Sequence, residues 1–130
     1  KAVARRGYLP GLVLCSTARR TAETLDLVLP FLTPQPLCRL EPGLSHAEAA
    51  AILGRAAAID EGVGAVMFIG HNPGLEDLAL KLAGDGDLAR RIGEKFPTCA
   101  FAAFESPAAD WRSAAAGRWT PLAFLTPAGL

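Results

Sequence analysis

The sequence predicts an α/β fold, a three-layer α/β/α sandwich with a mostly parallel central sheet and an antiparallel C-terminal edge. Two observations lead to this prediction. Up to about residue 96, short apolar runs alternate with segments whose apolar residues recur every three or four positions. Beyond that point two apolar stretches flank a polar connection, SPAADWRSAAAG, which is typical of an antiparallel strand pair.

The individual elements follow from local patterns in chain order. Short apolar runs predict strands over 12–15, 36–40, 64–70, 98–105 and 117–125. Helical periodicity predicts helices over 18–29, 46–58, 73–83 and 87–96. No repeat, low-complexity segment or linker interrupts this order, so we expect one domain over 1–130.

Polar residues at the predicted helix starts support these boundaries. Ser16 or Thr17 is expected to cap the first helix. Ser45 and Glu48 have the spacing of a capping box ahead of the alanine-rich second helix. Asn72 occupies the cap position of the third helix, directly after a strand, and this places a strand-to-helix junction there.

Composition limits the classes of function. Thirteen basic and thirteen acidic side chains cancel, so no overall charge favours nucleic acid or a membrane surface as a partner. No apolar run approaches the length of a transmembrane helix. Cys15, Cys38 and Cys99 are an odd number of cysteines in apolar settings, and we interpret them as reduced core thiols of a cytoplasmic protein.

Two strand-to-helix junctions contain candidate site residues. His71 follows the apolar run VMFIG, and Arg19 and Arg20 fall in the first turn of the helix after LVLCST. Helix N-termini favour anions, and a first-turn arginine opposes the helix dipole unless an anion is bound nearby. A structural role for each residue stays open: a helix cap for His71, and a solvated pair for the arginines. Taken together, a guanidinium from Arg19 or Arg20 and the imidazole of His71 at one sheet edge predict a pocket for a phosphoryl group.

The residues predict neither a cysteine nucleophile nor a metal. Cysteine phosphatases place five residues between the cysteine and the arginine, whereas Cys15 and Arg20 enclose four, in a loop without glycine. The two histidines, His46 and His71, lie far apart in the sequence. We therefore expect no metal and no other cofactor.

The segments LCSTARRTAETL and GHNPGLEDLA together resemble the histidine phosphatase superfamily (phosphoglycerate mutase-like), and in particular its SixA-type phosphohistidine phosphatase branch. Counting from Ser16, the arginine of the family motif falls on Arg20 and its threonine on Thr24. The C-terminal segments KFPTCAFAAFE and LTPAGL are also similar to the end of SixA-type chains. The resemblance implies hydrolysis of phosphohistidine on a protein in signal transduction. It also implies that Arg20 and His71 act in catalysis and that both bind the phosphoryl group with Asn72.

One part of the family pattern is missing. The family's first strand carries an Arg-His motif whose histidine becomes phosphorylated, and no Arg-His pair occurs in these 130 residues. Because loss of an interior strand would leave unpaired ladder groups, we expect the N-terminal strand and its catalytic loop to precede Lys1 in the full protein. Two alternatives stay open. One is a non-catalytic phospho-ligand binding module, and the other is a phosphatase of small phosphate esters, for which Glu41 and Glu48 are the available acids.

Overall fold

The computed structural model describes residues 10–32, 35–44, 47–60, 62–70, 74–94 and 101–125. Their contacts divide the chain into two compact units. The first unit draws its described residues from 1–47 and 59–71, and the second from 48–58 and 72–130. The expectation of one domain over 1–130 stays a prediction.

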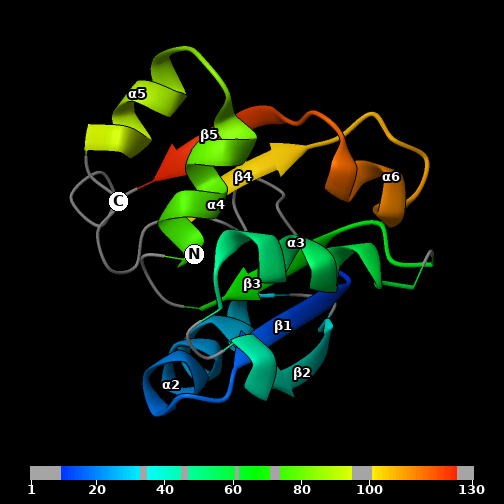
Figure 1. Cartoon of the computed structure of the whole chain (residues 1–130). Helices are drawn as coiled ribbons and strands as arrows, with labels where there is room; N and C mark the ends of the chain where they lie inside the picture. Colours follow the sequence, from blue (N-terminus) through cyan, green and yellow to red (C-terminus); the bar gives the residue numbers. More distant parts are fainter. Residues whose placement is uncertain are drawn as a thin grey trace. The chain divides into compact units, whose positions relative to one another are not determined.

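Three parallel strands form the sheet of the first unit (Figure 1). Strand β1 (Leu12–Ser16) lies in the middle, between β2 (Leu37–Glu41) and β3 (Val66–Ile69). Both pairings are parallel, so the carboxyl ends of all three strands lie at the same edge. Strand β1 is buried along its whole length, as expected for the central strand of a parallel sheet with the apolar sequence LVLC. The predicted α/β class with a parallel sheet is confirmed.

Helix α2 (Arg19–Val28) packs on one face of this sheet. Its Leu25 contacts Val13 and Cys15 of β1, and Leu32 completes the buried cluster. Short 3-10 helices, η1 (Leu29–Phe31) and η2 (Pro42–Leu44), follow α2 and β2 respectively.

Two of the predicted helix caps are wrong. Helix α2 is capped by Ala18, and not by Ser16 or Thr17. Ser16 is the last residue of β1, and its Oγ accepts the Ala18 N–H at 3.2 Å. Helix α3 (Ala49–Ala57) has Glu48 in its own cap position, with extended backbone and with its carbonyl accepting the first helical bonds. In a capping box the glutamate is the third residue of the helix, whereas Glu48 stands just before the first one. Ser45 lies outside the described residues.

The second unit combines helices with an antiparallel strand pair. Its further elements are α4 (Gly74–Ala83), α5 (Asp87–Glu94), β4 (Phe101–Glu105), α6 (Trp111–Ala116) and β5 (Thr120–Leu125). Strands β4 and β5 form the predicted antiparallel pair, but in a sheet of their own and not at the edge of the main sheet. An apolar pattern predicts which face of a strand is buried and leaves open which strand pairs with its edge. In the structure Phe124 of β5 is buried against Ala79 and Ala83 of α4 and Ile92 of α5, so this pair builds its core with helices.

Helix α6 lies within the polar connection SPAADWRSAAAG, for which no helix was predicted. The Oδ1 of Asp110 accepts the Ser113 N–H at 2.7 Å, and this backbone hydrogen bond lowers the pKa of the Asp110 carboxyl. Trp119 Nε1 donates to the carbonyl of Ala114 at 2.8 Å, with the Trp119 ring centroid 6.5 Å from that of Trp111. The sequence pattern that could have predicted this helix is Asp110, a good cap residue, followed by the alanine-rich segment WRSAAA.

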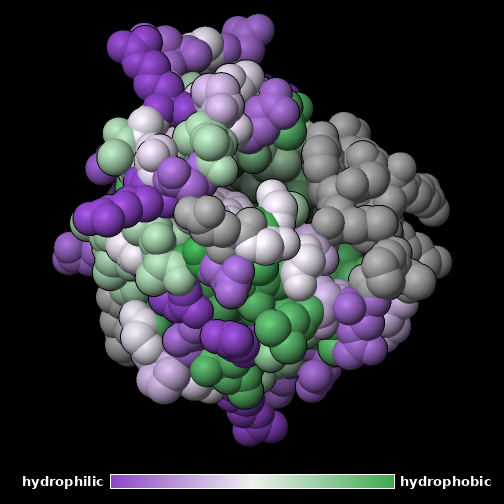
Figure 2. Space-filling model, turned by 90° about the vertical axis from the view of Figure 1, so that its right-hand side faces the viewer, coloured by the Kyte–Doolittle hydropathy of each residue, from purple (hydrophilic) through white to green (hydrophobic). Residues whose placement is uncertain are grey.

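Some large hydrophobic side chains are exposed on the described surface. Figure 2 shows hydrophobic patches in green among hydrophilic residues in purple on one face of the molecule. The exposed large hydrophobic residues are Leu27, Phe31, Leu37, Leu40 and Leu122. Two of them belong to β2, which among the described residues pairs with β1 alone and buries less of its surface than β1 does.

Replacing Ile92 by alanine is expected to lower the free energy of unfolding by about 2–5 kcal/mol. The side chain is 1% exposed and packs in the core with Ala79 and Phe124, so its loss leaves a cavity. Urea unfolding followed by circular dichroism measures the change. Leu27→Ala is the control, because Leu27 is 74% exposed and its removal should change stability by no more than about 0.5 kcal/mol. Equal effects of the two substitutions would contradict this core.

Candidate functional site

The carboxyl edge of the parallel sheet brings three chain segments together. Strand β1 ends at Ser16, β2 ends at Glu41 and β3 ends at Ile69, with Ser16 and Glu41 directly opposite each other. Ligands of open α/β sheets bind beyond this edge. Helix α2 begins just past Ser16, at Arg19, so its N-terminus lies at the same edge.

Buried hydrogen bonds tie the end of β1 to the start of α2. Thr21, 4% exposed, donates its Oγ1 proton to the carbonyls of Ser16 and Ala18, each at 2.8 Å. Ser16 is fully buried, and its Oγ accepts the Ala18 N–H. These contacts fix the first turn of α2 relative to β1. Sequence reasoning passed over Thr21, although a threonine in the first turn of a helix is a known local hydrogen-bonding pattern.

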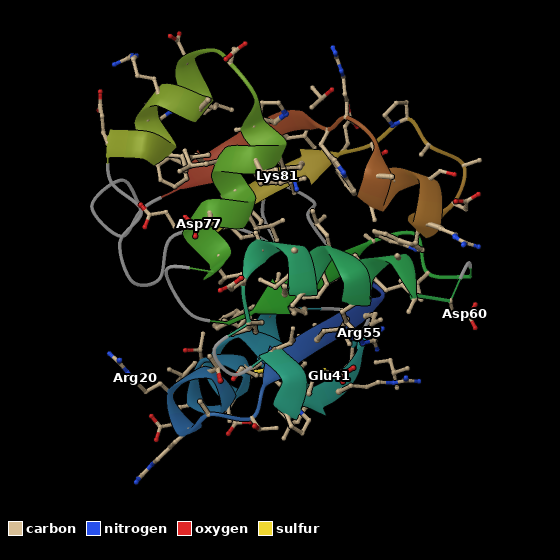
Figure 3. All side chains as sticks on the ribbon, viewed as in Figure 1. Arg20, Glu41, Arg55, Asp60, Asp77 and Lys81 are labelled. Atoms are coloured by element: carbon tan, nitrogen blue, oxygen red, sulfur yellow. The ribbon has the colours of Figure 1, made fainter. Side chains whose placement is uncertain are left out.

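The two arginines of the first turn have different partners. Arg19 Nε donates to Glu23 Oε1 at 3.0 Å, an exposed pair four residues apart on α2. Arg20 has no carboxylate partner among the described residues, and Figure 3 shows its side chain extending away from the α2 ribbon. The guanidinium of Arg20 is therefore the one open to an anion from outside the described part of the chain.

The other predicted ligands, His71 and Asn72, lie outside the described residues. Strand β3 ends two residues before His71, at the same sheet edge as Ser16 and Glu41. The expected proximity of His71 to Arg20 stays a prediction.

Cys15 has the properties of a core thiol. It is fully buried, and its Sγ donates to the Ser16 carbonyl at 3.3 Å. Burial raises the pKa of the Cys15 thiol, and the nearby Thr21 hydroxyl lowers it by a smaller amount. Burial likewise raises the pKa of Cys38, and both residues are free thiols. Because the thiolate is the nucleophile, a raised pKa makes Cys15 a poor one. Cys99 lies outside the described residues.

The raised pKa of Cys15 predicts a loss of stability at alkaline pH. The native state holds this proton more tightly than the unfolded chain does, so the stabilisation is complete below the unfolded thiol value of about 8.5. It is lost as the pH rises through the higher native value. Urea unfolding at pH 7 and pH 10 should therefore show a larger loss of stability for the wild type than for Cys15→Ala. Equal losses would contradict the assignment.

The described residues offer neither a ligand cluster for a metal ion nor a membrane-spanning helix. Within the described ranges, no three or more His, Cys, Asp or Glu side chains gather as a metal site would require. In that same part of the chain, no helix is both long and apolar enough to cross a membrane. The absence of a metal requirement stays a prediction.

Two solved structures resemble nearly the whole of this chain. One is the putative phosphohistidine phosphatase SixA from Agrobacterium tumefaciens, with a TM-score of 0.79 and 28% identity over 97% of this chain and 73% of that one. The other is the putative phosphohistidine phosphatase SixA from Nakamurella multipartitia, with a TM-score of 0.76 and 24% identity over 97% of this chain and 78% of that one. The chain has a SixA-like histidine phosphatase fold.

A curated relative extends beyond the matched region. The uncharacterized protein ML1117 of Mycobacterium leprae (strain TN) is 33% identical in an alignment of 116 positions that covers 85% of this chain. The chain spans only 62% of the length of that protein. No family model matches the chain.

Proposed function

We propose that the full-length protein is a phosphohistidine phosphatase that acts on a phosphorylated protein. The observation that carries the proposal is the Arg20 guanidinium, which stands in the first turn of a helix at the carboxyl edge of a parallel sheet and has no carboxylate partner among the described residues. The likeness to SixA-like structures supports it. Free thiols at Cys15 and Cys38 support a cytoplasmic location, where signalling by protein phosphohistidine would place it.

The proposed reaction has two steps. An enzyme histidine attacks the phosphorus, the bond to the substrate imidazole breaks, and the released imidazole takes up a proton. Water then attacks the enzyme phosphohistidine, which yields inorganic phosphate and restores the free histidine. Because no Arg-His pair occurs in these 130 residues, the proposal assigns this nucleophile to another part of the full-length protein.

Each predicted site residue has a separate role in this proposal. Arg20 binds two phosphoryl oxygens with its planar guanidinium. His71 donates to a third oxygen and stabilises the charge that develops in the transition state, and Asn72 adds a polar contact. An imidazole leaving group is less basic than an alkoxide, so the reaction needs no additional carboxylic acid.

The test is phosphate release by the full-length protein from a phosphohistidine protein, compared with release from p-nitrophenyl phosphate. We expect faster release from the phosphohistidine protein, with an acid-labile phosphoenzyme trapped during turnover. Hydrolysis of the ester alone would favour the small-ester alternative. Phosphate binding without hydrolysis of either substrate would favour a non-catalytic binding module.

One observation favours the small-ester alternative. Glu41 ends β2 and lies opposite Ser16 at the carboxyl edge of the sheet, where it is half-buried. A carboxylic acid near the phosphoryl group could protonate a departing alkoxide, which phosphate esters require and phosphohistidine does not.

Glu41→Gln separates the two candidate functions. In a phosphohistidine phosphatase, the substitution should leave phosphate release from a phosphohistidine protein within about threefold of the wild type. In an esterase that uses this acid, it should lower hydrolysis of an alkyl phosphate by about 10²–10⁴, the usual contribution of a general acid. Steady-state rates on both substrates measure the difference, and a large loss on phosphohistidine would contradict the proposed function.

A further inference from the structure

We propose that Thr21 is a positioning residue for Arg20. Its buried hydroxyl holds the first turn of α2 in the orientation that presents the Arg20 guanidinium to the phosphoryl group. The inference rests on the proposed function, and it assigns a role to a residue that stands behind the site without contacting the substrate.

A single hydroxyl proton serves two carbonyls in this arrangement. Thr21 Oγ1 lies 2.8 Å from the carbonyl oxygen of Ser16, the last residue of β1, and 2.8 Å from that of Ala18, the helix cap. A hydroxyl has one proton to donate, so the two carbonyls share it. The Thr21 side chain therefore connects strand and helix across the turn that separates them, in a place that water reaches poorly, since Thr21 is 4% exposed and Ser16 is fully buried.

The position of Arg20 depends on this connection. Arg20 directly precedes Thr21 and belongs to the same helical turn, so a tilt of that turn moves its guanidinium. The side chain of the cap residue, Ala18, makes no hydrogen bond to the helix, so the Thr21 hydroxyl shares the restraint of this turn with the Ser16 Oγ, which accepts the Ala18 N–H at 3.2 Å. Loss of the hydroxyl removes the O–H donor from both carbonyls. The Ala18 carbonyl keeps the Ala22 N–H at 3.0 Å, but the link from Thr21 to the end of β1 is lost, and this frees the turn to shift. A misplacement of about 1 Å can cost as much as a hundredfold in rate.

Thr24 offers a matched control on the same helix. Its Oγ1 donates to the carbonyl of Arg20 at 2.9 Å, so it too contacts the Arg20 backbone. That carbonyl lies within the helix, where it also accepts the main-chain N–H four residues later. Thr24 is half-exposed and makes no contact of this kind with β1. Removal of its hydroxyl should leave the orientation of α2 unchanged.

The experiment measures KM, kcat and the competitive inhibition constant of inorganic phosphate in the full-length protein, with a phosphohistidine protein as substrate. Thr21→Val keeps the shape of the side chain and removes the hydroxyl, and it should raise both KM and the phosphate inhibition constant by on the order of tenfold. Thr21→Ser keeps the hydroxyl and should stay within about twofold of the wild type. Thr24→Val should also stay near the wild type. Thr21→Ala and Thr21→Ser differ only in the hydroxyl, so this pair decides the question if Thr21→Val does not fold.

A purely structural role would give a different result. If the variants without the hydroxyl lower Tm and the active fraction but leave KM and the phosphate inhibition constant unchanged, the positioning role is overturned. Arg20→Ala, measured alongside, separates this failure from that of the proposed function. If Arg20→Ala is impaired while Thr21→Val and Thr21→Ala behave normally, only the positioning role fails. If Arg20→Ala has the KM, kcat and phosphate inhibition constant of the wild type, Arg20 does not bind the phosphoryl group, and both the proposed function and the positioning role of Thr21 are contradicted.

Discussion

Replacement of Arg20 by alanine is expected to lower kcat/KM for a phosphohistidine protein by about a hundredfold or more, comparable with the loss of one donor from a preorganised oxyanion site. The substitution removes a charge and a two-pronged donor from a group that stays anionic throughout the reaction. Ground-state and transition-state binding should therefore both weaken, so that KM rises as kcat falls. Steady-state phosphate release by the full-length protein measures both constants.

Arg19→Ala is the matched control for this prediction. Arg19 is the neighbouring arginine, and its guanidinium already pairs with Glu23 on the exposed side of α2. An exposed pair of this kind contributes a few tenths of a kcal/mol, so its loss should cost well under tenfold in kcat/KM. A larger effect of Arg19→Ala than of Arg20→Ala would show that the two arginines have been assigned in the wrong order.

His71→Ala is expected to cause a loss of similar size, about a hundredfold, with a different division between the constants. The imidazole of His71 is proposed to donate a hydrogen bond that strengthens as charge moves onto the phosphoryl oxygens. Its removal should lower kcat more than it raises KM. The measurement is the same steady-state assay, carried out over several substrate concentrations.

His46→Ala provides the comparison, because His46 is the other histidine of the chain and matches no family motif. Its rate should stay close to that of the wild type. A near-normal rate for His71→Ala would remove His71 from the site, and a selective rise in KM would limit it to ground-state binding.

The strands of the parallel sheet could be predicted because their signal is local. LVLC and VMFI are short apolar runs, and both are strands in the structure. The partnership of β4 and β5 could not be predicted in full, since an apolar pattern indicates that a strand is buried without naming what buries it. In the second unit Phe124 packs against helices, and β4 and β5 pair with each other in a sheet of their own.

Some residues of the candidate site could likewise be predicted from local sequence, and others depend on the fold. The spacing of the family motif selects Arg20. The ion pair between Arg19 and Glu23 is also a local feature, because the two residues lie four positions apart on the same helix. Thr21 and Glu41 depend on the folded chain. The hydrogen bonds of Thr21 exist only when the turn after β1 is closed, and Glu41 meets Ser16 only through the strand register. The sequence pattern of a single segment predicts neither the hydrogen bonds of Thr21 nor the position of Glu41 opposite Ser16.

The central place of β1 has a consequence for biosynthesis. Leu12 pairs with Leu37 on one side and with Val66 on the other, and 66 minus 12 is 54 residues of chain. At a synthesis rate of about 5–20 residues per second, β1 waits roughly 3–11 s for its second partner. Parallel pairing across such a separation is also slow in itself, because loop closure precedes any gain from contacts. During this interval one edge of a largely apolar strand is open to other nascent chains, so we expect the yield of native protein to rise at lower translation rates and with more chaperone present.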